Sequence, residues 1–263
     1  MSDGGWTAVV LAGQRPGETS FADAHEVAAK ALIPVADEPM LARVVRTLLQ
    51  ADHVDRIVIL AQQPDMLLAG SLAWMSGEQR ISTASSGDGI AASIAAIAGQ
   101  AQAPFPLLVT TADHALLDPA MIAAFLDRVG NDDAAFAVVE RPVVEAAYPE
   151  TKRTWLRFGD GDVTGANLFA LRTKAARKGL EIWGSIEEDR KKALKLMLSF
   201  GPILALRAIT RTISLDAALL QVGRRVGMTV RAVRLPFADA AVDVDKEADL
   251  LLANRILAER QQR

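Results

Sequence analysis

Residues 6–13, with the sequence WTAVVLAG, decide the fold of this chain. Trp6 to Leu11 form an apolar run rich in valine, which is typical of a strand buried on both faces. The run ends at Ala12-Gly13, and a polar loop that contains glycine and proline follows it. This pattern predicts a buried strand that leads into a long loop with a functional role.

A helix and a second strand are predicted after this loop. Asp37 has the position of a helix N-cap, with Pro39 in the first turn. Apolar side chains then recur at helical spacing over residues 40–49, and Arg56–Ala61 is the next buried strand. A strand, a helix and a strand in this order predict two parallel strands joined by a right-handed crossover.

The same alternation continues through the middle of the chain. Strands are predicted at Arg80–Ala84, Pro106–Thr111 and Ala134–Glu140, and helices at Ile90–Ala98 and from Asp118-Pro119 onward. Because strands and helices alternate regularly, we expect an α/β fold with a doubly wound, mostly parallel sheet.

The second half of the chain is less regular. Thr154–Phe158 and Val163–Leu171 predict an antiparallel hairpin around a glycine-containing turn. Residues 172–223 are predicted to be mostly helical, Met228–Leu235 to form a strand, and Lys246–Glu259 to form a closing helix. No linker or repeat separates these segments. We therefore expect a single domain over residues 1–263, with residues 172–223 as a helical insertion in its C-terminal half.

The composition excludes several classes of function. The chain has 263 residues, is 51% hydrophobic and has a formal net charge of −3, which allows a sizeable core and argues against a nucleic-acid-binding protein. It has no cysteine, which excludes disulfides, zinc ribbons and thiol chemistry. It has neither the basic start of a secretory signal nor an uncharged apolar stretch long enough to span a membrane. We therefore expect a cytoplasmic protein with no nucleic acid among its partners.

Two cationic side chains are candidates for binding a triphosphate. Arg15 lies in the loop after the first strand, where Gly13 would let the backbone approach a phosphate closely. The loop is neither a Walker A loop nor a GxGxxG turn, and an ordinary strand-to-glycine turn would have the same sequence. Lys30 lies in the apolar segment 29–35, where its charge is costly to bury. This lysine either neutralises a phosphate or extends to solvent.

Three carboxylates are candidates for binding magnesium. Asp113 follows an apolar run, and the carboxyl end of a buried strand is a good position for a metal ligand. Asp243 and Asp245 are two residues apart, so on a strand both side chains would point toward the same site. The alternatives are that Asp113 caps the next turn and that Asp245 caps the last helix. We favour Asp243 over Asp245 as the metal ligand, because Asp245 suits the helix cap.

Taken in order, these segments resemble the MobA-like and sugar-nucleotide nucleotidyltransferases, which share a GT-A-like NTP transferase fold. That family has a Leu-Ala-Gly loop with an arginine, followed by the pattern K-x-L-x-P-V-x-x-x-P-M-L. This chain has LAG at residues 11–13, then Arg15, then KALIPVADEPML at residues 30–41. It departs from the family at Gln14, where a second glycine is usual, and at residues 172–223, which match no member of the family.

The resemblance extends to three further segments: the glycine-containing loop at residues 86–89, residues 111–113 and residues 243–245. It implies a magnesium-dependent enzyme that transfers a nucleoside monophosphate from an NTP to a phosphorylated small molecule, with release of pyrophosphate. Such an acceptor is already an anion, so the reaction needs no general base. His114, next to a predicted metal ligand, either supports the metal site or lies on the surface.

The resemblance also implies a role for each matching residue. The residues that it implies for nucleotide binding are Leu11, Ala12, Gly13, Arg15, Lys30, Gly87, Gly89 and Ser93. The residues that it implies for catalysis are Arg15, Lys30 and Asp113. Binding of Mg²⁺ falls to Asp113 with Asp243 or Asp245, and binding of the acceptor to Asn167 and Arg153. In this mechanism the two cations neutralise the triphosphate and the charge that develops in the transition state.

Two other functions are compatible with the sequence. A GT-A glycosyltransferase would share the fold and an Asp-x-Asp metal motif, but in such enzymes the motif usually lies midway along the chain, and they lack the pair formed by Arg15 and Lys30. A non-catalytic nucleotide-binding regulator would tolerate Gln14 in the phosphate loop. Release of pyrophosphate would distinguish the transferase from both.

Residues 172–223 are the segment most relevant to possible contacts with a membrane or with a second copy of the chain. Basic residues crowd its first part, and an apolar series from Leu196 to Leu206 follows them. The basic residues are Arg172, Lys174, Arg177, Lys178, Arg190, Lys191, Lys192 and Lys195. We favour packing of the apolar residues on the sheet, and keep as alternatives attachment to an anionic membrane surface, an acceptor-side lid and a homodimer contact.

Overall fold

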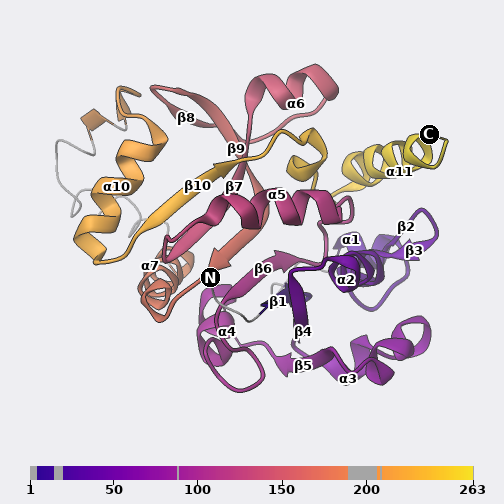
Figure 1. Cartoon of the computed structure of the whole chain (residues 1–263). Helices are drawn as coiled ribbons and strands as arrows, with labels where there is room; N and C mark the ends of the chain where they lie inside the picture. The colour runs from indigo at the N-terminus through magenta and orange to yellow at the C-terminus, as the bar shows by residue number, and fades with distance from the viewer. Residues whose placement is uncertain (1–4, 15–19, 88, 189–205, 208, 263) are drawn as a thin grey trace.

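The computed structural model describes residues 5–14, 20–87, 89–188, 206–207 and 209–262 (Figure 1). The strands of its main sheet are β1 (Trp6–Leu11), β4 (Val54–Ala61), β5 (Ile81–Ser85), β6 (Leu107–Thr111), β7 (Ala134–Glu140), β8 (Leu156–Phe158), β9 (Gly161–Leu171) and β10 (Val230–Arg234). Their order across the sheet is β10-β7-β9-β6-β1-β4-β5, with β8 paired to β9. A separate small hairpin consists of β2 (Pro34–Val35) and β3 (Glu38–Pro39).

The main sheet consists of two parallel groups joined by an antiparallel strand. β1 pairs in parallel with β4 and β6, and β4 pairs in parallel with β5, so the carboxyl ends of these four strands lie at one edge. β7 and β10 form a second parallel pair. β9 lies between the groups and pairs antiparallel with both β6 and β7. β8 and β9 form the antiparallel hairpin that the sequence predicts.

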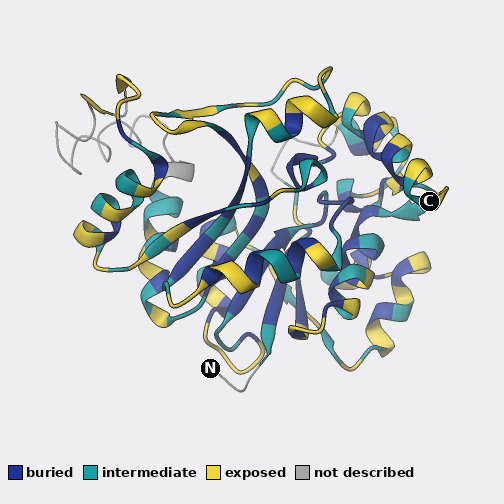
Figure 2. Ribbon diagram, turned by 45° about the horizontal axis from the view of Figure 1, so that its top comes forward, coloured by how far each residue is buried: buried dark blue, intermediate teal, exposed yellow. Residues whose placement is uncertain are grey.

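Helices cover both faces of this sheet. The longer ones are α2 (Met40–Gln50), α4 (Ile90–Ile97), α5 (Pro119–Val129), α6 (Arg141–Ala147), α7 (Arg177–Glu188), α10 (Leu215–Val226) and α11 (Glu247–Gln261). Ala8 and Val10 pack in one core cluster with α2 and α5, whereas Val9 packs in the other with α4 and α7. Figure 2 shows the buried strands between helices whose outer faces are exposed. Since successive residues of a strand face opposite sides, the predicted doubly wound arrangement is confirmed.

The starts of α2 and α5 differ in how they are capped. The helix predicted to open at Asp118-Pro119 is present as α5, and Asp118 caps it, because its side chain accepts a hydrogen bond from the N–H of Ala120 at 2.8 Å. Asp37 is not a cap: Ala36 and Asp37 have φ angles of 47° and 62° and form the turn of the β2–β3 hairpin. A two-residue hairpin turn of this type needs positive φ at both positions, which Asp tolerates. The α2 helix therefore begins only at Met40.

Residues 172–223, predicted as an insertion, are mostly helical where they are described, in the short 3₁₀ helix η3 (Lys174–Ala176), in α7 and in the first part of α10. Four of the described basic side chains donate to backbone carbonyls: Arg172 to Asp132, Arg177 to Ala98, Lys178 to Gly227 and Arg207 to Thr212. Arg190, Lys191, Lys192, Lys195 and the apolar series from Leu196 to Leu204 lie outside the described residues. No helix in the described ranges is long and apolar enough to cross a membrane. Membrane contact, a lid and a homodimer contact stay predictions.

Candidate active site

Loops from four parallel strands meet at the carboxyl edge of the sheet. Backbone hydrogen bonds continue past the strand ends: Ala12 N–H to Leu60 O at 2.8 Å, Ser86 N–H to Ala61 O at 2.9 Å, and Ala112 N–H to Leu11 O at 2.9 Å. These bonds hold each loop against the neighbouring strand. Leu11, Ala12 and Gly13, which the sequence predicts to bind a nucleotide, lie at this edge. In open α/β sheets ligands bind in this position.

Gln62 closes the loop that follows β1. Its side-chain Oε1 accepts a hydrogen bond from the N–H of Gln14 at 3.1 Å, and its Nε2 donates to the carbonyl of Gln14 at 2.7 Å. A Cβ on Gly13 would lie 3.0 Å from this amide, so the glycine lets Gln62 approach the loop. Gln62 was not predicted as a site residue, although it directly follows the second parallel strand. Arg15, the predicted cation of this loop, lies outside the described residues.

Ser93 organises the loop between β5 and α4. Its hydroxyl accepts a hydrogen bond from the N–H of Gly87 at 2.9 Å and donates to the carbonyl of Gly89 at 2.6 Å. The side chain is buried, and in this structure its hydroxyl is engaged within the loop. Ser93 therefore shapes the segment that carries the two predicted base-reading glycines. The nucleotide-binding roles of these three residues stay predictions.

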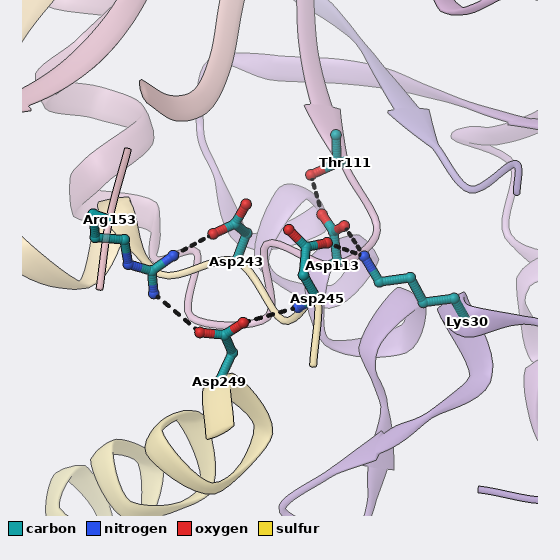
Figure 3. A network of polar contacts seen from close by, with 7 residues as sticks. All are labelled: Lys30, Thr111, Asp113, Arg153, Asp243, Asp245 and Asp249. Carbon is teal, nitrogen blue, oxygen red and sulfur yellow. Dashed lines mark hydrogen bonds and ion pairs between the residues drawn. The ribbon is translucent and has the colours of Figure 1, made fainter. Parts of the chain in front are cut away.

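Lys30 joins two of the predicted metal ligands (Figure 3). It begins the short 3₁₀ helix η1 (Lys30–Leu32), and its Nζ lies 2.5 Å from Oδ2 of Asp113. It also donates to Oδ1 of Asp245, which lies 215 residues further along the chain. The other oxygen of Asp113 accepts from the hydroxyl of Thr111 at 2.5 Å. Lys30 therefore binds carboxylates at the end of β6 and does not extend freely to solvent.

Val244 brings the two C-terminal aspartates to this network. It is fully buried, and its N–H donates to the carbonyl of Asp113 at 3.0 Å. Asp243 and Asp245 flank it, and Figure 3 shows both carboxylates in the same network. The backbone bond thus ties the segment after the short 3₁₀ helix η4 (Ala238–Ala241) to the end of β6 and brings both aspartates into one network, although residues 243–245 do not form a strand.

Arg153 is the second cation of the network. Its Nη1 lies 2.6 Å from Oδ1 of Asp243, and its Nη2 lies 3.6 Å from Oδ1 of Asp249. The side chain is 10% exposed, and its Nε and Nη2 have no hydrogen-bond partner among the described residues. Arg153 was predicted to bind the acceptor; here it neutralises Asp243 and keeps unpaired N–H donors. Asp249, in the first turn of α11, was not predicted as a site residue. Its position four residues after Asp245, at the start of the predicted closing helix, could have indicated that the two carboxylates lie close together.

The network carries more negative than positive charge, because four carboxylates face two cations. Burial alone would lower the pKa of Lys30, but the charges and hydrogen bonds of Asp113 and Asp245 outweigh it and raise that pKa. Burial and the charge of Asp245 raise the pKa of Asp243, and Arg153 offsets part of this rise. Burial is the largest single influence on Asp245 and would raise its pKa, but the hydrogen bond and charge of Lys30, together with Asp243 and Arg153, outweigh it and lower that pKa. The site therefore favours a further cation.

The aspartates fit a magnesium ion that arrives with a triphosphate. Within the described ranges, no three His, Cys, Asp or Glu side chains form a ready metal-binding group. In nucleotide sites Mg²⁺ usually takes one or two carboxylates and completes its shell with phosphate oxygens and water. Asp113 and Asp245 converge on a single ammonium group and provide such a pair, whereas Asp243 is engaged by Arg153. The donor set thus favours Asp245 over Asp243.

Asn167 lies in an irregular part of β9 at the same edge of the sheet. It has a φ angle of 45°, a left-handed conformation that asparagine tolerates better than most residues. Leu168, the neighbour of Asn167, pairs with Thr110 and is the last residue of β9 to pair with β6 at this end. The register of β7 against β9 also shifts in this region. Bulges redirect side chains and are frequent next to active sites. The predicted acceptor residue therefore lies beside the carboxyl end of β6.

Three alternatives considered for single residues are wrong. Asp113 does not cap the next turn, because both of its oxygens accept hydrogen bonds from side chains. Asp245 does not cap α11, whose N-cap is Lys246 without a side-chain bond, so the reason for preferring Asp243 as metal ligand is lost. His114 does not lie on the surface: it is fully buried, and burial lowers its pKa to about 4. The neutral imidazole lies 3.4 Å from the hydroxyl of Thr110, at the end of the strand that leads to Asp113.

Comparison with known proteins agrees with this architecture. The family model described as "MobA-like NTP transferase domain" matches residues 8–177. A hypothetical transferase from Thermus thermophilus is 28% identical, with a TM-score of 0.75 over 94% of this chain and 99% of that chain. A search of curated proteins found no match. The carboxylates of residues 243–249 lie beyond the segment that the family model matches. The fold brings them next to Lys30 and Asp113, which lie inside that segment.

Two more distant structures share the fold. One is 4-diphosphocytidyl-2C-methyl-D-erythritol synthase from Anaerococcus prevotii, with 10% identity, a TM-score of 0.55, and 97% and 96% of the two chains covered. The other is CMP:2-keto-3-deoxy-manno-octonic acid synthetase complexed with CTP, with 13% identity, a TM-score of 0.56, and 97% and 99% covered. These likenesses confirm the predicted GT-A-like, mostly parallel fold.

Proposed function

Since the chain belongs to the family of MobA-like NTP transferases, we propose that it transfers a nucleoside monophosphate from an NTP to a phosphorylated small molecule. Pyrophosphate is the second product. The observation that carries the proposal is the meeting of Lys30, Asp113 and Asp245 beside the loops of β1 and β5. Cations and carboxylates next to backbone loops are what nucleotidyl transfer needs, because the reaction depends on positioning and on neutralising charge.

We propose that Asp113 and Asp245 hold Mg²⁺ together with the oxygens of the triphosphate. When bound, the ion would neutralise phosphate charge and polarise the phosphorus–oxygen bond that breaks. Its chemistry suits this pair, since both aspartates already converge on a positive charge. Asp243 stays with Arg153 and keeps that arginine in place.

Lys30 is placed to exchange partners when the nucleotide binds. Its raised pKa keeps it charged, and it contacts the same carboxylate oxygens that the metal would use. If Asp113 and Asp245 held the ion, the ammonium group of Lys30 would be released to pair with a phosphate oxygen of the nucleotide. The lysine then stabilises charge in the transition state and not a carboxylate in the resting site.

We propose that the acceptor binds on the side of the network that faces β9. Arg153 offers unpaired N–H donors there, and Asn167 lies in irregular backbone beside the end of β6. A guanidinium group suits a phosphate, and its charge assists each hydrogen bond. The acceptor phosphate would then attack from the side opposite the leaving pyrophosphate, without a general base.

A screen for pyrophosphate release tests the proposal. CTP, GTP, UTP and ATP are each incubated with MgCl₂ and with phosphorylated sugars, polyols, glycerates and cofactor precursors. Release that depends on one nucleotide and one acceptor is expected, and it should be lost in Asp113→Asn. Asp65→Asn is the matched control, because Asp65 is an exposed carboxylate in the short helix α3 (Pro64–Leu67) and should leave turnover unchanged.

Two outcomes would contradict the proposal. Transfer of a sugar from a nucleotide sugar, with no pyrophosphate released from any NTP, would identify a glycosyltransferase. Tight nucleotide binding without turnover of any acceptor would identify a regulator. Calorimetric titration with each nucleotide, run beside the screen, detects the binding, and slow release of pyrophosphate by transfer of the NMP to water would distinguish an enzyme that lacks its acceptor from a regulator.

A further inference from the structure

A polar cavity lies between α2 and α11, near the loop that follows Asp113. Its volume is about 220 Å³, and it shares no residue with the network around Lys30. Among its described lining residues are three arginines, Arg43, Arg46 and Arg260, and one carboxylate, Glu38. Figure 1 shows α11 beside α2 and the β2–β3 hairpin, the elements that supply these side chains. We call this space the arginine cavity.

Arg43 is poorly satisfied in the arginine cavity. Its Nη1 lies 3.5 Å from the carbonyl of Val35 and 3.5 Å from Oε2 of Glu38, both at the long limit of a hydrogen bond. Its Nε is buried and has no hydrogen-bond partner among the described residues. A guanidinium group carries five N–H donors, and leaving them unpaired away from water costs free energy. The side chain is 21% exposed, so solvent satisfies only part of it.

The other two arginines are held in place by firm contacts. Arg46 Nε donates to Oε1 of Glu38 at 2.7 Å, and its guanidinium lies 4.4 Å from the centre of the Trp74 ring. Arg260 Nη2 lies 2.5 Å from Oδ2 of Asp239 and 3.2 Å from the carbonyl of Leu116. The walls of the cavity are therefore set before any ligand arrives, which lowers the entropy that binding would cost.

The cavity also concentrates like charge. Burial lowers the pKa of Arg43, Glu38 offsets part of this, and the positive charge of Arg260 lowers it further. Glu38 is shared between two arginines and already accepts its shorter bond from Arg46. An anion between Arg43 and Arg260 would supply the missing acceptor oxygens and relieve the repulsion at once.

We propose that the arginine cavity binds a phosphate-type oxyanion, as free phosphate or as the phosphate group of a small metabolite. The planar fork of arginine matches two oxygens of a phosphate, and several arginines around one anion are typical of phosphate recognition. Thr47 and Gln50 also line the cavity and add polar atoms to its wall. The site lies outside the catalytic network and is a second binding site on the chain.

Binding here would act on both sides of the catalytic network. On one side, Arg43 contacts Val35, which follows Lys30 in the same segment. On the other, Arg260 contacts Leu116, in the loop that begins with Asp113. An anion held by both arginines ties these two segments together. The arginine cavity is therefore a site through which a phosphorylated metabolite would regulate the placement of catalytic residues.

Titration of the full chain with inorganic phosphate tests the proposal, with calorimetry for binding and thermal unfolding for stability. The wild type should bind phosphate and gain in Tm. Arg43→Met should weaken binding by about tenfold or more, because charge-assisted hydrogen bonds are lost. Arg128→Met is the matched control, since Arg128 donates to Ala124 within its own helix and should keep the phosphate response.

Lys30→Met separates this site from the catalytic edge, because that variant should keep the phosphate response. A response that survives in Arg43→Met, or one that disappears in Lys30→Met, would overturn the proposal. In phosphate-free buffer, an unfilled anion site predicts an unchanged or higher Tm for Arg43→Met, and a clear loss of Tm would assign Arg43 a structural role instead. If Arg43→Met does not fold, Arg43→Lys replaces it, and undiminished phosphate binding by that variant would count against the proposal.

Discussion

Replacing Lys30 with methionine removes the cation that Asp113 and Asp245 share. The lysine is 25% exposed and Asp113 19%, whereas Asp245 is 60% exposed. Breaking a buried ion pair by removing one partner costs about 3–5 kcal/mol, and an exposed pair contributes about 0–1 kcal/mol. The intermediate exposure of Lys30 places its loss at about 2 kcal/mol. For a chain of this size that corresponds to a fall in Tm of roughly 4–8 °C in metal-free buffer.

The same substitution should strengthen magnesium binding in the absence of nucleotide. The ammonium group and a divalent cation compete for the same carboxylate oxygens, so the wild type must first release Lys30. In Lys30→Met no such competitor exists, and the carboxylates repel one another until a cation binds. Millimolar MgCl₂ should therefore raise the Tm of the variant more than that of the wild type, as measured by differential scanning calorimetry.

Lys246→Met is the matched control for the loss of one positive charge, because Lys246 is exposed and follows Asp245 directly in the chain. It should change neither the Tm in metal-free buffer nor the response to MgCl₂. An unchanged Tm for Lys30→Met without metal, or an equal rise with metal in both proteins, would refute the reasoning. In the pyrophosphate assay Lys30→Met should lower kcat/KM by about 10²-fold or more. Lys30→Arg should not restore it fully, because a planar fork differs from a point charge.

Three further predictions follow from the same edge of the sheet. Asp113→Asn should lower turnover by about 10²-fold or more while circular dichroism stays unchanged, and a folded variant with near-normal turnover would remove Asp113 from the site. Gln62→Ala should raise the Kd for nucleotide by roughly tenfold, because the backbone of Gln14 loses both of its anchors, and equal calorimetric Kd values would contradict this. Because the pKa of His114 is lowered from 6.5 to about 4, its neutral form stabilises the fold above pH 6.5, and this contribution is lost as the pH falls toward 4. Urea unfolding should show a loss of about 3 kcal/mol over that range, absent in His114→Gln and kept in His53→Gln; the same slope in all three proteins would count against it.

The parallel half of the fold could be predicted from the sequence because its strands are continuous apolar runs. Such runs are recognisable without knowledge of their neighbours, and Ala134–Glu140 was predicted with the bounds that the structure has. The place of β9 between β6 and β7 could not be predicted, since strand neighbours are set by tertiary packing. Asp37 was predicted wrongly because Asp suits both helix caps and tight turns, and only the backbone angles distinguish them.

The candidate site was predicted where residues follow a strand or match a family motif. Lys30, Asp113 and Asp245 belong to this group, and the structure brings them together. Asp249 was missed because an acidic residue in the first turn of a helix is common for reasons of helix polarity alone. Gln62 was missed because its role depends on the loop of a neighbouring strand, which no local pattern reveals.

The antiparallel strand β9 determines when the sheet can be completed as the chain is synthesised. The group formed by β1, β4, β5 and β6 is contained in residues 6–111, whereas β9 begins only at Gly161. Until that strand emerges from the ribosome, the outer side of β6 keeps unpaired N–H and C=O groups, and an unpaired edge of apolar residues readily recruits another chain. A protein shortened before residue 161 would therefore aggregate instead of forming a smaller nucleotide-binding unit.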